Sequence, residues 1–161
     1  MPLNLLPQNI CPNSSPNPLS YAYLASMVAE SKAVKWDGVA KIDLTRGEGE
    51  GDACVGRIKL PPGHFNGETM FVPRHDDPAA CASEDDGFLV TFVHDEAAGS
   101  SYLGIWDAAT MDDAPLARVA LPARVPYGFH AAWVGREAFG AQLRSAPLAA
   151  APLEGATLVA A

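Results

Sequence analysis

Three extended segments follow one another closely in the second half of the chain, and their spacing constrains the fold more than any other feature. GFLVTFVHDE (residues 87–96), YLGIWDA (residues 102–108) and LARVALP (residues 116–122) are rich in β-branched and aromatic residues. A polar turn separates the first two, and the acidic connection ATMDDAP separates the second from the third. This spacing predicts an antiparallel meander, the unit from which a β-propeller blade is made.

The first half of the chain also favours strands. VAKIDLT (residues 39–45) alternates in polarity and predicts a half-buried strand, and GRIKLP and GETMFVPR are two further extended runs. YAYLASMVA (residues 21–29) is apolar enough for a buried strand or a short helix, and at this length the pattern leaves both open. The predicted fold class is therefore all-β and antiparallel.

The two ends of the chain differ from this middle part. Five prolines in the first 19 residues block helix interiors and sheet ladders, so residues 1–20 are predicted to form an extended linker. Residues 136–161 are rich in Ala and Pro and have no polar face, which predicts a loosely ordered tail. The start of the chain lacks the pattern of a signal peptide, and we expect no secretion and no transmembrane segment.

Composition excludes one class of partner. The formal net charge is −8 and the 161 residues include only 11 Lys and Arg, so a surface that tracks nucleic-acid phosphates is not expected. The three cysteines, Cys11, Cys54 and Cys81, have neither a CxxC nor a zinc spacing, and we expect reduced thiols.

Several short motifs carry little chemistry. GEGEG (residues 47–51) has two glutamates that would repel a phosphate, which favours a solvated turn. HDDP (residues 75–78) and SEDD (residues 83–86) lack the ligand spacing of calcium or zinc sites. No local signature of a catalytic nucleophile is present.

The four histidines are candidates for metal ligands. His64 and His75 fall in polar segments where solvent exposure is expected, and His94 ends a predicted strand, where a hydrogen bond at the turn accounts for it. His130 is surrounded in sequence by Tyr127, Phe129 and Trp133, and a buried imidazole needs a partner for its nitrogens. A backbone carbonyl or a metal ion would satisfy it, and the residues alone leave both open.

Five segments together resemble a known family. GETMFVPR, EDDGFLVTFVHDE and LARVALPARVPYGFHAAW are similar, in the same order, to carboxy-terminal motifs of the carotenoid cleavage oxygenases, and YAYLA and WDGVAKIDL resemble the segments before them. The resemblance covers residues 21–134. It implies a seven-bladed β-propeller with non-haem Fe(II) on its axis, held by four histidines, that cleaves a carotenoid or apocarotenoid double bond with O₂.

The resemblance assigns roles to two residues of this chain. His130 matches the last of the four iron ligands, and Glu68 matches a glutamate that contacts a ligand histidine without binding the metal. A carboxylate that accepts an N–H from a ligating imidazole fixes the orientation of the ring, which agrees with that role.

The chain also departs from the family pattern. The family's other three ligands lie upstream of the matching segment, so His64, His75 and His94 are not their equivalents. Thr69 replaces a usual proline, and no carboxylate stands near Leu5 or Leu6, where the family has a glutamate. A blade takes ~40–50 residues, so residues 21–135 hold about two to three blades, and we expect open blade edges to promote association.

Three functional hypotheses follow. The first is a carboxy-terminal fragment of an Fe(II)-dependent carotenoid dioxygenase, inactive alone. The second is a non-catalytic propeller fragment that binds a polyene or a protein partner, and the third is a small β-sheet domain whose His130 is structural. The sequence does not decide between plastid and cytosol.

Overall fold

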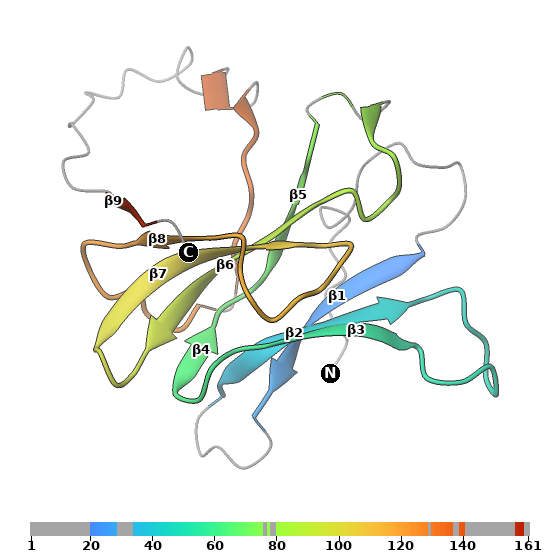
Figure 1. Ribbon diagram of the computed structural model, residues 1–161, viewed down its shortest axis with the longest axis horizontal. Coiled ribbons are helices and arrows are strands. Elements are labelled where there is room, and N and C mark those ends of the chain that lie inside the picture. Colours follow the sequence, from blue (N-terminus) through green and yellow to red (C-terminus); the bar gives the residue numbers. More distant parts are fainter. Residues whose placement is uncertain are drawn as a thin grey trace.

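The computed structural model describes residues 20–28, 34–75, 77, 80–128, 130–136 and 139–140, together with the backbone of residues 157–159. Its strands form one antiparallel sheet that divides into two meanders (Figure 1). The all-β, antiparallel prediction is confirmed. Within the described residues, no helix has the length and apolar character that crossing a membrane requires.

The first meander contains three strands that pair in chain order. β1 pairs with β2, and β2 pairs with β3; their bounds are β1 Tyr21–Met27, β2 Trp36–Asp43 and β3 Cys54–Lys59. The segment for which a helix had stayed open is therefore a strand. Its aromatic residue Tyr23 is buried and its hydroxyl donates a hydrogen bond to the carbonyl oxygen of Ala108 (3.2 Å), in the second meander.

The second meander is built around two long strands. β6 pairs with β7, β7 pairs with β8, and both β4 and β5 pair with β6; the bounds are β4 His64–Asn66, β5 Met70–Pro73, β6 Gly87–Asp95, β7 Ser100–Asp107 and β8 Ala117–Ala120. The three strands predicted between residues 87 and 122 are thus confirmed. A ninth strand, β9 (Thr157–Val159), pairs with β8.

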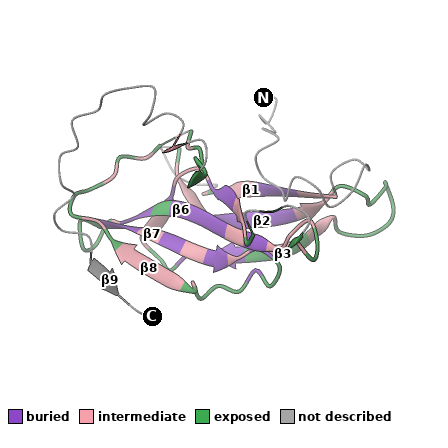
Figure 2. Cartoon of the chain, turned by 90° about the horizontal axis from the view of Figure 1, so that it is seen from above, coloured by how far each residue is buried: buried purple, intermediate pink, exposed green. Residues whose placement is uncertain are grey.

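The core joins the two meanders. Buried apolar side chains from β1, β2, β3, β5, β6 and β7 pack together, and the largest fully buried ones are Trp106, Phe71, Ile58, Leu89 and Val93. Figure 2 shows this burial running along β1, β2, β6 and β7. The shared core fixes the position of β6, which carries much of the candidate site.

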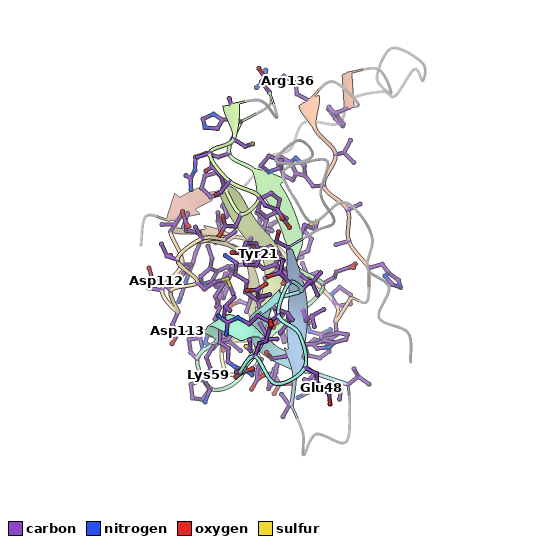
Figure 3. All side chains as sticks on the ribbon, turned by 90° about the vertical axis from the view of Figure 1, so that its right-hand side faces the viewer. Tyr21, Glu48, Lys59, Asp112, Asp113 and Arg136 are labelled. Carbon is purple, nitrogen blue, oxygen red and sulfur yellow. The ribbon has the colours of Figure 1, made fainter. Side chains whose placement is uncertain are left out.

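The connection between β7 and β8 ties the second meander to the first. Asp113 accepts a hydrogen bond from the backbone N–H of Lys59 (2.6 Å), and its own carbonyl oxygen accepts one from the indole of Trp106 (3.1 Å). Figure 3 shows Asp113 beside Lys59, next to Asp112. The acidic connection predicted from the sequence therefore also links the two meanders by hydrogen bonds.

The acidic loop at residues 83–86 provides a second link between the two meanders. Glu84 accepts hydrogen bonds from the backbone N–H groups of Ser20 and Tyr21, at 2.9–3.0 Å. Asp85 forms an ion pair with the buried Lys41 of β2 (2.5 Å), and Asp86 pairs with Arg74 at the end of β5 (2.8 Å). The three carboxylates of this loop thus bind groups of the protein itself.

The structure corrects two expectations, one about a cysteine and one about a histidine. Cys81 is disulfide-bonded, whereas Cys54 is a free thiol, so the expectation of three reduced cysteines is wrong for Cys81. Spacing along a chain does not reveal which cysteines a fold brings together. His64 begins strand β4 and is half-buried, whereas solvent exposure was expected.

The predictions for the two ends are mostly beyond what is described. Of the linker at residues 1–20 only Ser20 is described, and of the tail at residues 136–161 only a few positions besides β9. The predicted turn at residues 47–51 is observed, exposed and closed by a hydrogen bond from the N–H of Gly47 to the carboxylate of Glu50 (2.8 Å).

Candidate functional site

Glu68 is placed by an irregularity between β4 and β5. Asn66 pairs with Val93 and Met70 pairs with Val90, so the three residues between β4 and β5 face two residues of β6. This is a β-bulge, a feature that redirects a side chain away from the regular alternation of a strand. The bulge is held by the hydroxyl of Thr91, which donates to the carbonyl oxygen of Glu68 (3.0 Å).

The chain between residues 125 and 131, whose described residues have no regular secondary structure, passes over this bulge and carries His130. The backbone N–H of Ala131 donates a hydrogen bond to Oε2 of Glu68 (2.6 Å), and Nδ1 of His130 lies 3.6 Å from the same oxygen. The segment also approaches Gly67 closely, because a Cβ atom there would lie 3.4 Å from the carbonyl oxygen of Gly128. The two residues assigned by resemblance, His130 and Glu68, thus lie side by side.

His130 is exposed, contrary to the expectation of an imidazole enclosed by aromatic rings. Its side chain is 74% exposed, and Trp133 is 52% exposed. Tyr127 points elsewhere and packs edge-on against the ring of His94, with 5.8 Å between the ring centroids. The sequence argument failed because neighbours along an irregular segment need not face the same way; Phe129 is outside the described residues.

The other three histidines serve local structure. His94 is buried, with Nδ1 3.2 Å from the hydroxyl of Ser101 and Nε2 3.3 Å from Nε of Arg124. His64 contacts Tyr102 and Asp95, and His75 is an exposed residue 3.9 Å from Asp86. None of these contacts involves His130.

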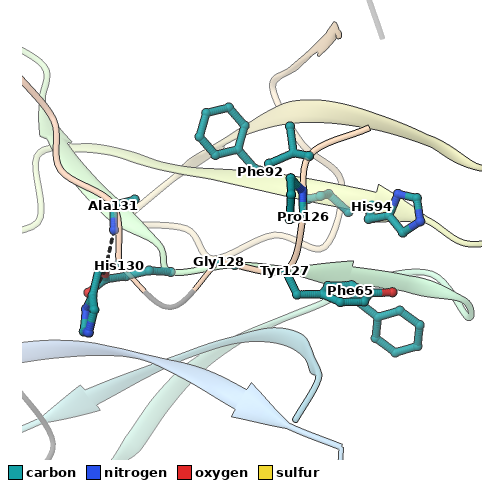
Figure 4. Close-up of a pocket in the computed structure, with 12 residues that line it drawn as sticks. Phe65, Phe92, His94, Pro126, Tyr127, Gly128, His130 and Ala131 are labelled. Carbon is teal, nitrogen blue, oxygen red and sulfur yellow. Dashed lines mark hydrogen bonds and ion pairs between the residues drawn. The ribbon is translucent and has the colours of Figure 1, made fainter. Parts of the chain in front are cut away.

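A small cavity lies between the segment and the sheet. It has a volume of about 290 Å³, and its lining includes Phe65, Phe92, Val125, Pro126 and Tyr127 as well as Glu68 and His130. Figure 4 shows His130 and Ala131 at one end of this cavity and His94 at the other. The cavity is therefore largely apolar, with the imidazole and the carboxylate at one end.

In the part of the chain that the structure describes, His130 is the one candidate metal ligand at Glu68. Among the described residues, no group of three or more His, Cys, Asp or Glu side chains is arranged to hold a metal ion. The imidazole of His130 fits a single ligand, since Nδ1 faces a carboxylate, the ring is largely exposed, and no described residue hydrogen-bonds Nε2. Further ligands would have to come from groups outside this part of the chain.

The site also contains residues that the sequence did not single out. Tyr127 donates a hydrogen bond to Glu96 (2.6 Å), and Ser101 accepts one from the backbone N–H of Val125 (3.0 Å). Tyr127 was noticed only as an aromatic neighbour of His130. The pairing of β6 with β7, and not any local motif, brings Ser101 to the segment.

Comparison with known proteins supports the resemblance. The family model of the retinal pigment epithelial membrane protein matches residues 8–135. A chloroplastic 9-cis-epoxycarotenoid dioxygenase of Oryza sativa subsp. japonica is 48% identical over 102 residues, which are 63% of this chain and 16% of the relative. A carotenoid 9,10(9′,10′)-cleavage dioxygenase of Phaseolus vulgaris is 44% identical over 115 residues, which are 71% of this chain and 21% of the relative.

Solved structures give the same result. A mutant of the Synechocystis apocarotenoid oxygenase is similar with a TM-score of 0.59 and 27% identity, covering 78% of this chain and 24% of that one. A cobalt-substituted form of the same enzyme also has a TM-score of 0.59, with 26% identity and the same coverage. This chain spans about a fifth of the length of the curated relatives it matches. It belongs to the retinal pigment epithelial membrane protein family, the family of the carotenoid cleavage oxygenases.

Proposed function

We propose that this chain is a carboxy-terminal part of a carotenoid cleavage dioxygenase and that it supplies one iron ligand, His130. The observation that carries the proposal is the placement of an exposed imidazole with Nδ1 3.6 Å from Glu68. Relatives named as carotenoid cleavage dioxygenases and a cobalt-substituted structural neighbour support a metal-dependent cleavage reaction. The substrate class is a carotenoid or apocarotenoid, with O₂ as the second substrate.

Glu68 orients the ligand in this proposal. When Nδ1–H points to the carboxylate, Nε2 has no proton and presents its lone pair outward. The N–H of Ala131, which donates to the same carboxylate, keeps Glu68 in place. The negative charge of Glu68 also offsets part of the charge of a divalent cation that four neutral imidazoles would leave uncompensated. Bound Fe(II) would supply open coordination positions and electrons for the reaction of O₂ with the polyene.

The proposal includes inactivity of the chain alone. The described residues bring one imidazole next to Glu68, whereas the family resemblance implies four histidine ligands, and His64, His75 and His94 make local contacts instead. We therefore assign three ligands, and most of the surface that holds the polyene, to parts of a longer protein.

The test is iron binding and turnover by the purified 161-residue chain. After anaerobic loading with Fe(II) and removal of free metal, we expect no stoichiometric iron and no cleavage of a carotenoid or apocarotenoid. The same result is expected for His130→Ala and for the exposed control His75→Ala. Stoichiometric iron that His130→Ala alone abolishes, together with cleavage products, would contradict the fragment proposal.

The cavity favours one second candidate, a non-catalytic module that binds a polyene. Its lining by Phe65, Phe92 and Pro126 suits an apolar group. This candidate predicts that polyene binding, measured by a shift of the carotenoid absorption band, survives His130→Ala. Absence of such binding would exclude it and leave the first proposal standing.

A further inference from the structure

The segment that carries His130 is held at a few points only. None of its described residues forms a backbone–backbone hydrogen bond with the described strands. Its hydrogen bonds to the sheet run from the N–H of Val125 to Ser101, from the hydroxyl of Tyr127 to Glu96 and from the N–H of Ala131 to Glu68. The position of the imidazole therefore depends on side chains of β7, of the turn after β6 and of the bulge.

We call the three sheet-side partners of these hydrogen bonds, together with the segment residues that bind them, anchors. The first anchor, the bond from Val125 to Ser101, is held in place by a chain of hydrogen bonds. Arg124 can only donate, so its Nε contact of 3.3 Å makes Nε2 of His94 an acceptor. The proton of His94 then sits on Nδ1 and points to the hydroxyl oxygen of Ser101 (3.2 Å), which also accepts from Val125. The buried His94 thus holds Ser101 in the orientation that receives the start of the segment.

The second anchor, Tyr127, lies three residues before His130. Its ring packs edge-on against His94 and Phe65, with centroid distances of 5.8 and 6.3 Å. Its hydroxyl donates to Oε1 of Glu96 (2.6 Å), an oxygen that also accepts from Lys35 (2.5 Å). Lys35 lies just before β2, so this anchor connects the segment to the first meander as well.

The electrostatics of the second anchor agree with this geometry. The hydrogen bond from Lys35, followed by that from Tyr127, holds the pKa of Glu96 below its ordinary value. Desolvation first, and then the hydrogen bond to Glu96, raises the pKa of Tyr127. Near neutral pH the hydroxyl is therefore a donor and the carboxylate an ionised acceptor, the stronger arrangement of such a pair.

We infer that Tyr127 is a positioning residue for His130: through Glu96 it holds the irregular segment against the sheet, so that Nδ1 of His130 stays beside Glu68. This inference rests on the proposed function for its meaning, because the position of His130 matters to the reaction only if His130 is a ligand. The contacts that hold the segment are made by the chain itself and can be measured without a metal.

The test is amide hydrogen exchange in Tyr127→Phe, followed by NMR in the metal-free 161-residue chain. This substitution keeps the ring and removes only the hydroxyl. We expect the Ala131 amide to exchange roughly fivefold faster while the amides of β6 keep their protection, since one solvent-exposed hydrogen bond is lost. The matched control is Tyr23→Phe, which removes a buried hydroxyl bonded to Ala108 in the core.

Two further variants separate positioning from general stability. Glu96→Gln keeps an acceptor oxygen and should retain most of the protection of Ala131, whereas Glu96→Ala should lose it as Tyr127→Phe does. Unchanged exchange of Ala131 in Tyr127→Phe, or equal acceleration in β6 and at Ala131, would overturn the inference. The exchange measurement needs no iron. It can therefore support the anchoring by Tyr127 even if the iron-binding test contradicts the proposed function.

Discussion

At the scale of single residues, Gly38 of β2 has no space for a side chain, because the backbone of β3 lies too close. A Cβ atom on Gly38 would lie 2.2 Å from the carbonyl oxygen of Ile58, in the neighbouring strand β3. A backbone atom within a paired strand cannot move aside without breaking the ladder. Gly38 therefore permits the close approach of β2 and β3.

The substitution Gly38→Ala is expected to lower the free energy of unfolding by about 1–3 kcal/mol, the usual cost of overpacking. Urea denaturation followed by tryptophan fluorescence would measure it. Gly135→Ala is the control, because a Cβ atom there meets nothing within 4 Å. Equal stability of the two variants would contradict the close approach.

The candidate site was predictable from the sequence only in part. The motifs that contain Glu68 and His130 allowed the pair to be named, and the structure brings Glu68 and His130 together, at 3.6 Å. The burial expected for His130 was wrong, because aromatic neighbours in sequence do not determine the direction of a side chain on an irregular segment. The anchors Ser101 and Glu96 could not be found, since strand pairing and not local sequence brings them to the segment.

At the scale of elements, the acidic loop before β6 joins the two meanders through Lys41 and Asp85. The side chains of the two residues are only 6% and 16% exposed, and Lys41 also donates to the carbonyl oxygen of Ala108 (3.2 Å). Burial alone would raise the pKa of Asp85, but hydrogen bonds from Lys41 and Ser83 outweigh it and hold that pKa below its ordinary value. Asp85 is therefore ionised near neutral pH.

Asp85→Ala is expected to cost about 3 kcal/mol of unfolding free energy, because it leaves the ammonium of Lys41 buried without its carboxylate. The double variant Lys41→Met with Asp85→Ala should recover a large part of that loss, since no unpaired charge remains. A double-mutant cycle by urea denaturation measures both. If the double variant lost as much unfolding free energy as the two single variants together, the unpaired buried charge of Lys41 would not be the cause of the loss.

Strand positions were easier to predict than strand interruptions. The long strands β6 and β7 follow from β-branched and aromatic content, a local property. The division of one edge into β4 and β5 depends on an extra residue opposite β6, which only the pairing reveals. For the same reason His64 was expected in a loop although it pairs with Asp95 in the sheet.

At the scale of the whole molecule, the chain forms two joined meanders and spans about a fifth of the length of its curated relatives. Large apolar side chains stay exposed on it, among them Met27, Phe92, Leu116 and Trp133. Apolar surface of this kind is typical of a surface that another part of a protein covers. The size and the exposed apolar residues agree with a site that other segments complete.

The most direct measurement of this account is the iron content of a chimera in which residues 21–135 replace the matching segment of the Phaseolus vulgaris dioxygenase. We expect about one iron per polypeptide and carotenoid cleavage, loss of both in His130→Ala, and retention of both in the control His75→Ala. Glu68→Gln should weaken iron binding by about 10- to 100-fold, the usual effect of losing a partner of a ligand histidine. Full iron content and activity in His130→Ala would contradict the central claim that this chain contributes His130 to the metal centre.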